Sequence, residues 1–307
     1  MGCMPRDGIS DYIDKRNWIE YNEKLVRRGE LYLSLDFLDH WDEEIERTNE
    51  GKRGRPYAYP WSMMEFLGYV HNLLMPFRQI EGFLGKLSQF VPQLEVPDYT
   101  TIWWRVSRMD IPAPPIDVKE PIVIAIDSSG VKVTNKGEWM RKKWRGDEYK
   151  GWIKVHVAVN VKTKETVAME ITDERTADHT AVPSLIDQIE SNGGRVRRVL
   201  ADGAYYNTQT YNLLQEKGID AGIRMRKDAT TRARGSPYRA RCVREFRSMG
   251  YEKWREEKDY GKRWSAEALF SAFKRIFGEY VVSKRTDLMY KEVRMKLILY
   301  NLLLNMK

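Results

Sequence analysis

The sequence predicts an α/β protein in which a mixed β-sheet is flanked by helices and preceded by an all-helical N-terminal part. Two observations support this prediction. From residue 122 onward, short apolar segments of strand length alternate with amphipathic segments of helix length, which is the pattern of a sheet covered by helices. Before it, residues 61–109 contain three helix-length segments, and the proline-rich stretch 111–121 separates the two parts as a linker.

Length, composition and net charge limit the classes of protein to which the chain can belong. A chain of 307 residues with 42% hydrophobic residues can bury a sizeable core in one large domain or in two to three smaller ones. The formal net charge of +8 suggests a polyanionic partner, although many basic proteins bind none. Cys3 and Cys242 fit no metal or redox spacing, so we expect free thiols in a reducing cytoplasm. No apolar run is long enough for a transmembrane helix and no signal peptide is evident, so no membrane partner is expected.

Residues 1–55 are predicted to form an N-terminal helical arm. Ser10 can cap a helix that Gly29 ends. Residues 31–37 alternate between apolar and polar, which is a short strand signal, and residues 39–47 have the composition of a charged helix. Because the arm carries more acidic than basic residues, we expect it to serve packing or self-association.

The arm ends in the basic stretch GKRGRP at residues 51–56. Arg53 and Arg55 flank a glycine, as in hooks whose extended arginine side chains enter a narrow minor groove of DNA. A basic interdomain linker is the competing interpretation, because a short motif of this kind is weak.

Residues 56–110 are predicted to form a helical DNA-binding domain. Its three helical segments are broken at Pro76 and at residues 92–97, and Thr100 or Thr101 could cap the third. Three short helices with tight connections suit a helix-turn-helix-like module, and a plain helical bundle fits the same pattern equally well.

Residues 122–307 are predicted to form the α/β domain. Its first buried strand, 122–126, ends at Asp127, and residues 131–133 can return as a second strand. Another buried strand ends just before Asp202. Further strands are expected at 153–161, 166–171, 196–200 and 219–223, and helices at 179–191, 208–217 and 287–306.

Positive charge is concentrated in one basic insertion, residues 224–262. Residues 224–263 hold 14 Lys and Arg against 6 Asp and Glu, whereas the rest of the chain holds 38 of each. The segment also carries aromatic residues, and charge gathered in one place indicates nucleic acid more strongly than the total does. The alternative is a solvated charged insertion.

Residues 258–277 read as an amphipathic helix with one polar stripe. At about 100° per residue, Tyr260, Arg263, Glu267 and Lys274 fall within about 60° of one another. A surface ladder of ion pairs is the simplest interpretation of such a stripe. A functional site is the other.

Asp127, Asp202 and Glu267 could converge on one point, because ligand sites in open α/β sheets gather at strand ends. Three carboxylates without a matching set of His or Cys ligands suit hard cations such as Mg²⁺ or Mn²⁺. Two such ions can clamp the attacking and leaving oxygens of a phosphodiester. Without a cation the carboxylates would repel one another and hold raised pKa values.

Together the strand IVIAIDSSG, the strand LADGAYYN and the Tyr-x2-Arg-x3-Glu-x6-Lys spacing resemble a DDE transposase of a prokaryotic insertion sequence. The resemblance covers about residues 55–307. It implies a ribonuclease H-like catalytic core with Asp127, Asp202 and Glu267 as catalytic residues and ligands of two Mg²⁺ or Mn²⁺ ions.

The same resemblance implies that Arg263 and Lys274 contact transposon-end phosphates and that Tyr260 supports that region. It implies double-stranded DNA as partner, both terminal inverted repeats and target, with a homodimer in the synaptic complex and a nucleoid-associated location. The segment of about 40 residues before the Glu helix is short beside the β-rich insertion of some relatives, which puts a hairpin route in doubt.

Other residues have two interpretations each. Trp254 could stack on a flipped base, but most Trp side chains are buried. His156 and His179 could act as catalysts, but the position of His156 on a buried strand favours a core histidine, and that of His179 at the start of a helix favours a cap or local contact. A basic and aromatic cluster lines the DNA path or forms a packed edge; it comprises Trp139, Arg141, Lys142, Lys143, Trp144 and Arg145.

Two further functions fit the same residues. A metal-dependent nuclease or junction resolvase would use the same carboxylates, but the helical N-terminal part and the Tyr-Arg-Glu-Lys spacing disfavour it. A domesticated, catalytically inactive DNA-binding protein is disfavoured because all three acidic residues are present.

Overall fold

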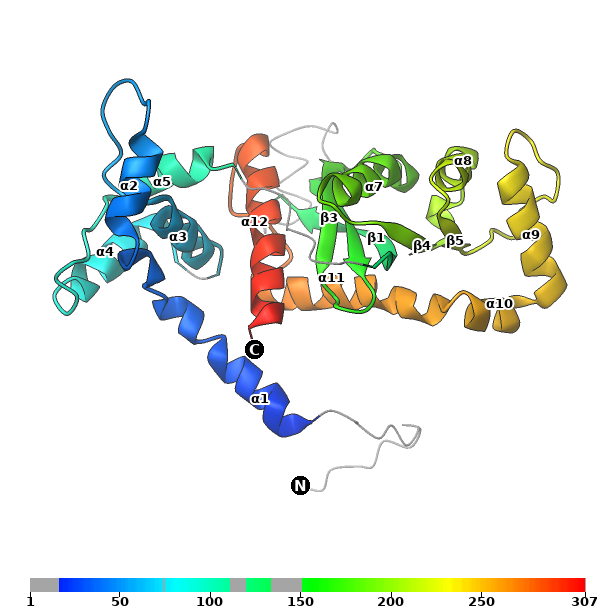
Figure 1. Cartoon of the computed structure of the whole chain (residues 1–307), viewed down its shortest axis with the longest axis horizontal. Coiled ribbons are helices and arrows are strands. Elements are labelled where there is room, and N and C mark those ends of the chain that lie inside the picture. The colour runs from blue at the N-terminus through cyan, green and yellow to red at the C-terminus, as the bar shows by residue number, and fades with distance from the viewer. Residues whose placement is uncertain (1–16, 74, 111–119, 134–150, 307) are drawn as a thin grey trace.

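The computed structural model describes residues 17–73, 75–110, 120–133 and 151–306 (Figure 1). Its centre is a five-stranded sheet in the order β3-β2-β1-β4-β5. β1 pairs antiparallel with β2, β2 pairs antiparallel with β3, and β4 and β5 run parallel to β1. This is the ribonuclease H-like mixed sheet that was expected. The bounds are β1 Ile122–Lys132, β2 Trp152–Asn160, β3 Thr166–Asp173, β4 Val196–Ala201 and β5 Asp220–Ile223.

The first strand is longer than predicted. β1 does not end at residue 126, because residues 127–132 continue to pair with β2, from Asp127 opposite Val157 to Lys132 opposite Trp152. Its parallel neighbour β4 stops at Ala201, directly before Asp202. The prediction of a turn after residue 126 is therefore wrong, and what ends near Asp127 is the neighbouring strand.

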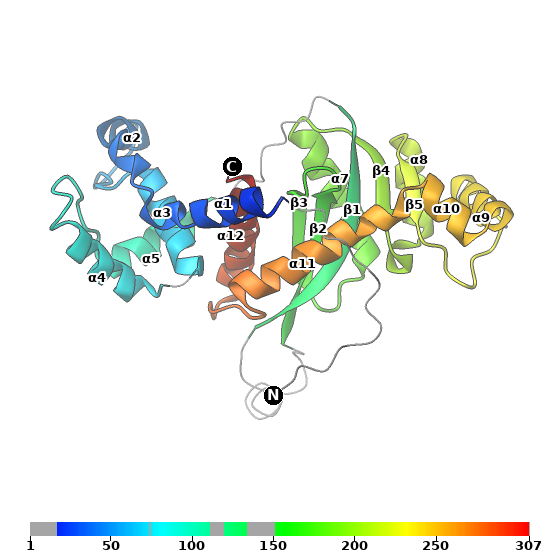
Figure 2. The same cartoon turned by 90° about the horizontal axis from the view of Figure 1, so that it is seen from below.

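Helices cover both faces of the sheet (Figure 2). On one face, α7 (Val182–Ser191) and α8 (Thr208–Glu216) pack over Ile124 and Val199. On the other face, α11 (Trp264–Phe277) and α12 (Thr286–Asn305) share a core with Ala125 and Leu200. Alternate residues of β1 and β4 thus point to opposite faces, as the pleat of a strand requires.

The N-terminal helices pack onto α12 on the side away from the sheet (Figure 1). α3 (Trp61–Leu73), α4 (Phe77–Leu87) and α5 (Tyr99–Arg108) contact one another. A Cβ on Gly68 of α3 would lie 2.9 Å from Cε of Met295 on α12, so glycine permits this close approach. Asp98, rather than Thr100 or Thr101, caps α5 by accepting from two backbone N–H groups. Whether the three helices form a helix-turn-helix-like module stays a prediction.

The arm holds α1 (Trp18–Arg27) and α2 (Trp41–Asn49). The strand expected at residues 31–37 is wrong: the 3₁₀ helices η1 (Glu30–Leu33) and η2 (Asp36–Leu38) replace it, and Phe37 is buried in the helical core instead of joining a sheet. Asn17 caps α1 through its side chain. Ser10, Cys3, most of the linker at 111–121 and the Trp139–Arg145 cluster lie outside the described residues.

The basic insertion folds as two helices, α9 (Pro237–Met249) and α10 (Tyr251–Glu257), at the end of the molecule opposite α4 (Figure 1). The 3₁₀ helix η6 (Tyr260–Arg263) joins α10 to α11, so the helix predicted over residues 258–277 becomes regular only at Trp264. No helix among the described residues is long and apolar enough to cross a membrane.

Candidate active site

The pairing register of β1 and β4 brings Asp127 and Asp202 together. Ala125 lies opposite Leu200 in this parallel pair, so two residues further along each chain Asp127 and Asp202 stand at the same level. Neighbouring strands lie about 4.8 Å apart, and residues separated by two point to the same face. Both carboxylates therefore emerge on the face that α11 covers. Asp202 also caps the 3₁₀ helix η5 (Gly203–Tyr205) by accepting from the Ala204 N–H at 2.8 Å.

α11 presents Glu267 beside these two carboxylates. Ala266, Leu269 and Phe270 bury the helix against the sheet, which leaves the Glu267 side chain 54% exposed. Arg263 Nη2 forms an ion pair with Glu267 Oε1, and Arg263 Nη1 lies 4.0 Å from Asp127 Oδ2. Arg263 therefore stands between the first and the third predicted catalytic residue.

The pKa of Asp127 reports this crowding. The pKa is raised to about 6: burial is the main cause, the charges of Asp202 and Glu267 add to the rise, and the Ser128 N–H and Arg263 oppose it. The signs follow from charge, since a like charge disfavours ionisation of the carboxyl and an opposite charge favours it. The three predicted acidic residues thus share one electrostatic site.

The three predicted acidic residues have the chemistry of ligands for a divalent cation, but only Asp127 and Asp202 are also placed together. Asp127 and Asp202 supply oxygen donors at the ends of adjacent strands, and a cation would offset the burial and the like charges that together raise the Asp127 pKa. Within the described residues, however, no group of three or more His, Cys, Asp or Glu side chains is placed to hold one metal ion. In this conformation Glu267 forms an ion pair with Arg263 instead. The Arg263–Glu267 pair of this conformation matches the ion-pair interpretation of the polar stripe.

Two aromatic residues predicted to contact DNA are buried. Trp254 is 1% exposed and packs against Phe246, Tyr251 and Tyr260, with its ring centroid 5.0 Å from that of Tyr260. Tyr260 itself is 6% exposed. The interpretation of Trp254 as a stacking platform for a base is therefore wrong in this conformation, and its alternative, burial, is confirmed. Both rings anchor α10 and η6 ahead of α11.

The other predicted DNA contacts are further from the carboxylates. Lys274 is half-buried on the last turn of α11, about 10 Å along the helix from Glu267. Arg53 and Arg55 are exposed in the loop between α2 and α3, at the far end of the molecule from α9 (Figure 1).

The basic insertion presents most of its charge to solvent. Two of its cations are structural: the Arg239 guanidinium is 4% exposed and donates to the carbonyls of Thr230, Arg232 and Ala233, and Lys258 pairs with Asp220 at 3.0 Å. The other eleven are exposed: Arg224, Arg226, Lys227, Arg232, Arg234, Arg241, Arg244, Arg247, Lys253, Arg255 and Lys262.

Sequence reasoning missed Asp178, which lies in the 3₁₀ helix η4 (Asp178–Ala181) behind β1. Its carboxylate accepts from the Ser128 hydroxyl at 3.0 Å, and His156 Nδ1 lies 4.0 Å away. His156 is fully buried, as predicted, and His179 is half-buried in η4. No motif or spacing marked Asp178, because its partners come from separate strands.

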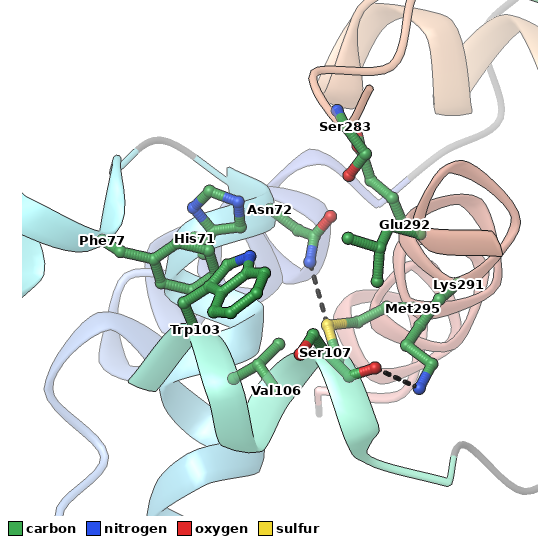
Figure 3. A pocket seen from close by; sticks show the side chains of 11 residues that line it. His71, Asn72, Phe77, Trp103, Val106, Ser107, Ser283, Lys291, Glu292 and Met295 are labelled. Atoms are coloured by element: carbon green, nitrogen blue, oxygen red, sulfur yellow. Dashed lines mark hydrogen bonds between the residues drawn. The ribbon is translucent and has the colours of Figure 1, made fainter. Parts of the chain in front are cut away.

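A small cavity of about 50 Å³ lies where α3 and α5 meet α12, and Asp127, Asp202 and Glu267 are not among its lining residues (Figure 3). The rings of His71 and Phe77 stack at 3.8 Å, and Asn72 Nδ2 donates to Met295 Sδ at 2.9 Å. Lys291 Nζ donates to the Ser107 carbonyl at 2.8 Å. The first of these contacts joins α3 to α4, and the other two fasten the N-terminal helices to α12.

Comparison with protein families gives two matches. A family described as "Transposase DDE domain" matches residues 119–302, and a second family of the same description matches residues 26–136.

Solved structures with some likeness include a piggyBac transposase synaptic complex with hairpin DNA, at 10% identity and a TM-score of 0.42, covering 91% of this chain and 73% of that one. A simian T-cell lymphotropic virus intasome in complex with PP2A regulatory subunit B56 gamma has 11% identity and a TM-score of 0.28, covering 68% and 66%. A Drosophila P element transposase strand transfer complex has 11% identity and a TM-score of 0.32, covering 88% and 70%. Scores this low do not support a residue-by-residue comparison.

Proposed function

Because this chain belongs to the transposase DDE domain family, and is therefore a DNA transposase, we propose that it cuts the ends of a prokaryotic insertion sequence and joins their 3′-hydroxyls to target DNA. Asp127, Asp202 and Glu267 carry the reaction. The observation that supports this most is the shared level and shared face of Asp127 and Asp202, beneath a helix that sets Glu267 beside them.

Asp127 and Asp202 would hold Mg²⁺ or Mn²⁺, and Glu267 would complete the second of two sites. When bound, the two ions supply an activated water and a clamp for the attacking and leaving oxygens of the phosphodiester. Glu267 can join them only by leaving Arg263, and its exposure makes that exchange cheap because an exposed ion pair contributes at most about 1 kcal/mol.

Arg263 gains a role when Glu267 leaves it. Its planar guanidinium would then be free to bind a DNA phosphate in bidentate fashion, beside the Asp127 carboxylate. Lys274 on the same helix, the exposed cations of the basic insertion, and Arg53 and Arg55 would follow the DNA backbone on either side. Two ends must be joined, so a homodimer in the synaptic complex, acting on the nucleoid in the cytoplasm, is part of the proposal.

The Arg263–Glu267 ion pair is also the observation that favours a second candidate, a DNA-binding protein that no longer cleaves. One experiment separates the possibilities. The protein is incubated with Mg²⁺, a target plasmid and DNA carrying inverted repeats taken from the sequence that flanks the gene. Joined products support the transposase, cleavage without joining supports a nuclease or resolvase, and binding alone supports the inactive candidate.

A matched pair of variants tests the assignment of Glu267. Glu267→Gln should abolish joining, because it removes one metal ligand and keeps the shape of the side chain. Glu279→Gln is the control: Glu279 is also exposed and paired with a cation, Lys132 at 2.7 Å, but it lies beyond the end of α11. It should join as the unaltered protein does.

A further inference from the structure

Behind β1, on the face that α11 does not cover, a cluster of polar side chains meets at Asp178. Ser128 follows Asp127 and points to this opposite face, where the antiparallel register sets it beside His156. Ser128 Oγ donates to Asp178 Oδ1 at 3.0 Å, and Lys154 Nζ lies 3.1 Å from the same oxygen. Side chains from β1 and β2 thus share one carboxylate oxygen of η4.

The cluster is largely removed from water. His156 is fully buried, and the side chains of Lys154 and Asp178 are 24% and 22% exposed. Lys154 is held further by the Thr176 carbonyl at 2.7 Å, and His156 Nε2 lies 3.0 Å from Thr172 Oγ1. Hydrogen bonds in a low dielectric are strong and directional, so these contacts fix the position of Ser128.

Ser128 connects this cluster to the proposed metal site. Its backbone N–H donates to Asp127 Oδ1 at 2.9 Å, while its hydroxyl donates to Asp178. Tyr205, 1% exposed and three residues after Asp202, lies within the electrostatic influence of Asp127, Asp178 and Asp202, each of which raises its pKa in addition to burial. The 3₁₀ helix η4, which carries Asp178, also contacts η5, which Asp202 caps. The back cluster therefore adjoins both predicted catalytic aspartates, through Ser128 on one side and through η5 on the other.

We propose that Asp178 is a positioning residue: by holding the Ser128 hydroxyl it fixes β1 at Asp127 and sets the direction in which Asp127 offers its carboxylate to a divalent cation. The inference rests on the proposed role of Asp127 as a metal ligand. Groups that orient a metal ligand without touching the metal commonly change metal affinity about 10- to 100-fold when removed. The rival explanation is a structural ion pair with Lys154 that has no influence on the site.

The test is thermal unfolding of the DNA-free protein during a titration with Mn²⁺, which requires no turnover. Asp178→Asn and Ser128→Ala should each raise the Mn²⁺ concentration of half-maximal stabilisation by about 10-fold or more. Ser128→Thr keeps the hydroxyl and should restore a nearly unaltered midpoint. If Asp178→Asn fails to fold, Ser128→Ala carries the test, because it removes one hydroxyl and leaves both charges of the cluster in place.

Asp220→Asn is the matched control. Asp220 is a partly buried carboxylate that accepts from Arg198 and Lys258, on the strand β5 at the far side of β4. Its loss should lower the metal-free melting temperature and leave the Mn²⁺ midpoint unchanged. The double variant Ser128→Ala/Asp178→Asn should raise the midpoint no further than the larger single change, because both act through one contact.

Two negative results have different meanings. If the unaltered protein is stabilised by Mn²⁺ and the Asp178→Asn and Ser128→Ala midpoints stay within twofold of it, the positioning role is overturned while the metal site stands. If the unaltered protein neither responds to Mn²⁺ nor cleaves DNA, the proposed function fails, and the role of Asp178 fails with it.

Discussion

Two glutamates on neighbouring helices each pair with a cation one helical turn away, yet their surroundings differ. On α12, Glu292 pairs with Lys296 at 2.6 Å, and the two side chains are 6% and 5% exposed. Glu292 also accepts from the backbone N–H groups of Val282 and Ser283, at 3.0 and 2.8 Å. On α11, Glu267 pairs with Arg263 and is 54% exposed, and no other hydrogen bond to it occurs among the described residues.

The difference separates a carboxylate that holds the fold from one that is available for chemistry. Glu292 is saturated by donors in a dry site, so its removal leaves the Lys296 charge and two N–H groups unpaired. Glu267 can give up one solvated partner at little cost and take another. In the sequence both are simply acidic residues four positions from a cation.

The largest effect on stability should come from Glu292→Gln. It leaves the Lys296 ammonium buried without its counter-charge, so we expect a loss of about 3–5 kcal/mol in the free energy of unfolding. Urea unfolding at neutral pH measures it. A loss below about 1 kcal/mol would remove the distinction between the two glutamates.

Lowering the pH should reduce the difference in the free energy of unfolding between the unaltered protein and Glu292→Gln. Burial alone would raise the pKa of Glu292, but Lys296 and the hydrogen bonds of Lys296, Ser283 and Val282 lower it below its usual value. A depressed carboxyl pKa contributes stability that is present above the unfolded-state pKa of about 4.3 and is lost as the pH falls through the folded-state value. Unfolding curves of the unaltered protein and Glu292→Gln should therefore converge below about pH 4. A constant gap down to acid unfolding would contradict this.

Glu267→Gln should have the smallest effect on stability. An exposed i,i+4 ion pair contributes about 0.3–0.5 kcal/mol, so the metal-free variant should unfold within about 0.5 kcal/mol of the unaltered protein. The same urea experiment, with Glu279→Gln as control, measures it. A loss of several kcal/mol would mean that Glu267 belongs with Glu292 as a structural residue.

Much of the α/β core could be predicted from local pattern. The apolar run at 122–126 and the strand-like segment at 196–200 indicated β1 and β4, and the acidic residue near the end of each indicated Asp127 and Asp202. What local pattern could not give was the register of β1 against β4, which sets these two side chains at one level, because strand pairing is a long-range choice.

Burial accounts for part of what else was missed. Trp254 and Tyr260 belong to a segment rich in exposed cations, yet both rings are buried, with Trp254 packed between Phe246 and Tyr260. The buried guanidinium of Arg239 holds backbone carbonyls, although its charge counted toward the basic insertion. Asp178 was overlooked for a different reason: only the folded chain brings it to Ser128.

The central claim is that Glu267, though paired with Arg263 in this conformation, completes the site of Asp127 and Asp202. The direct measurement is strand transfer by folded Glu267→Gln in Mg²⁺, with DNA carrying the terminal repeats and the unaltered protein alongside. We predict that joining falls at least about a thousandfold, the scale typical when one member of a group that acts as a unit is removed. Joining at the unaltered rate would contradict the claim and leave Glu267 as one partner of a surface ion pair.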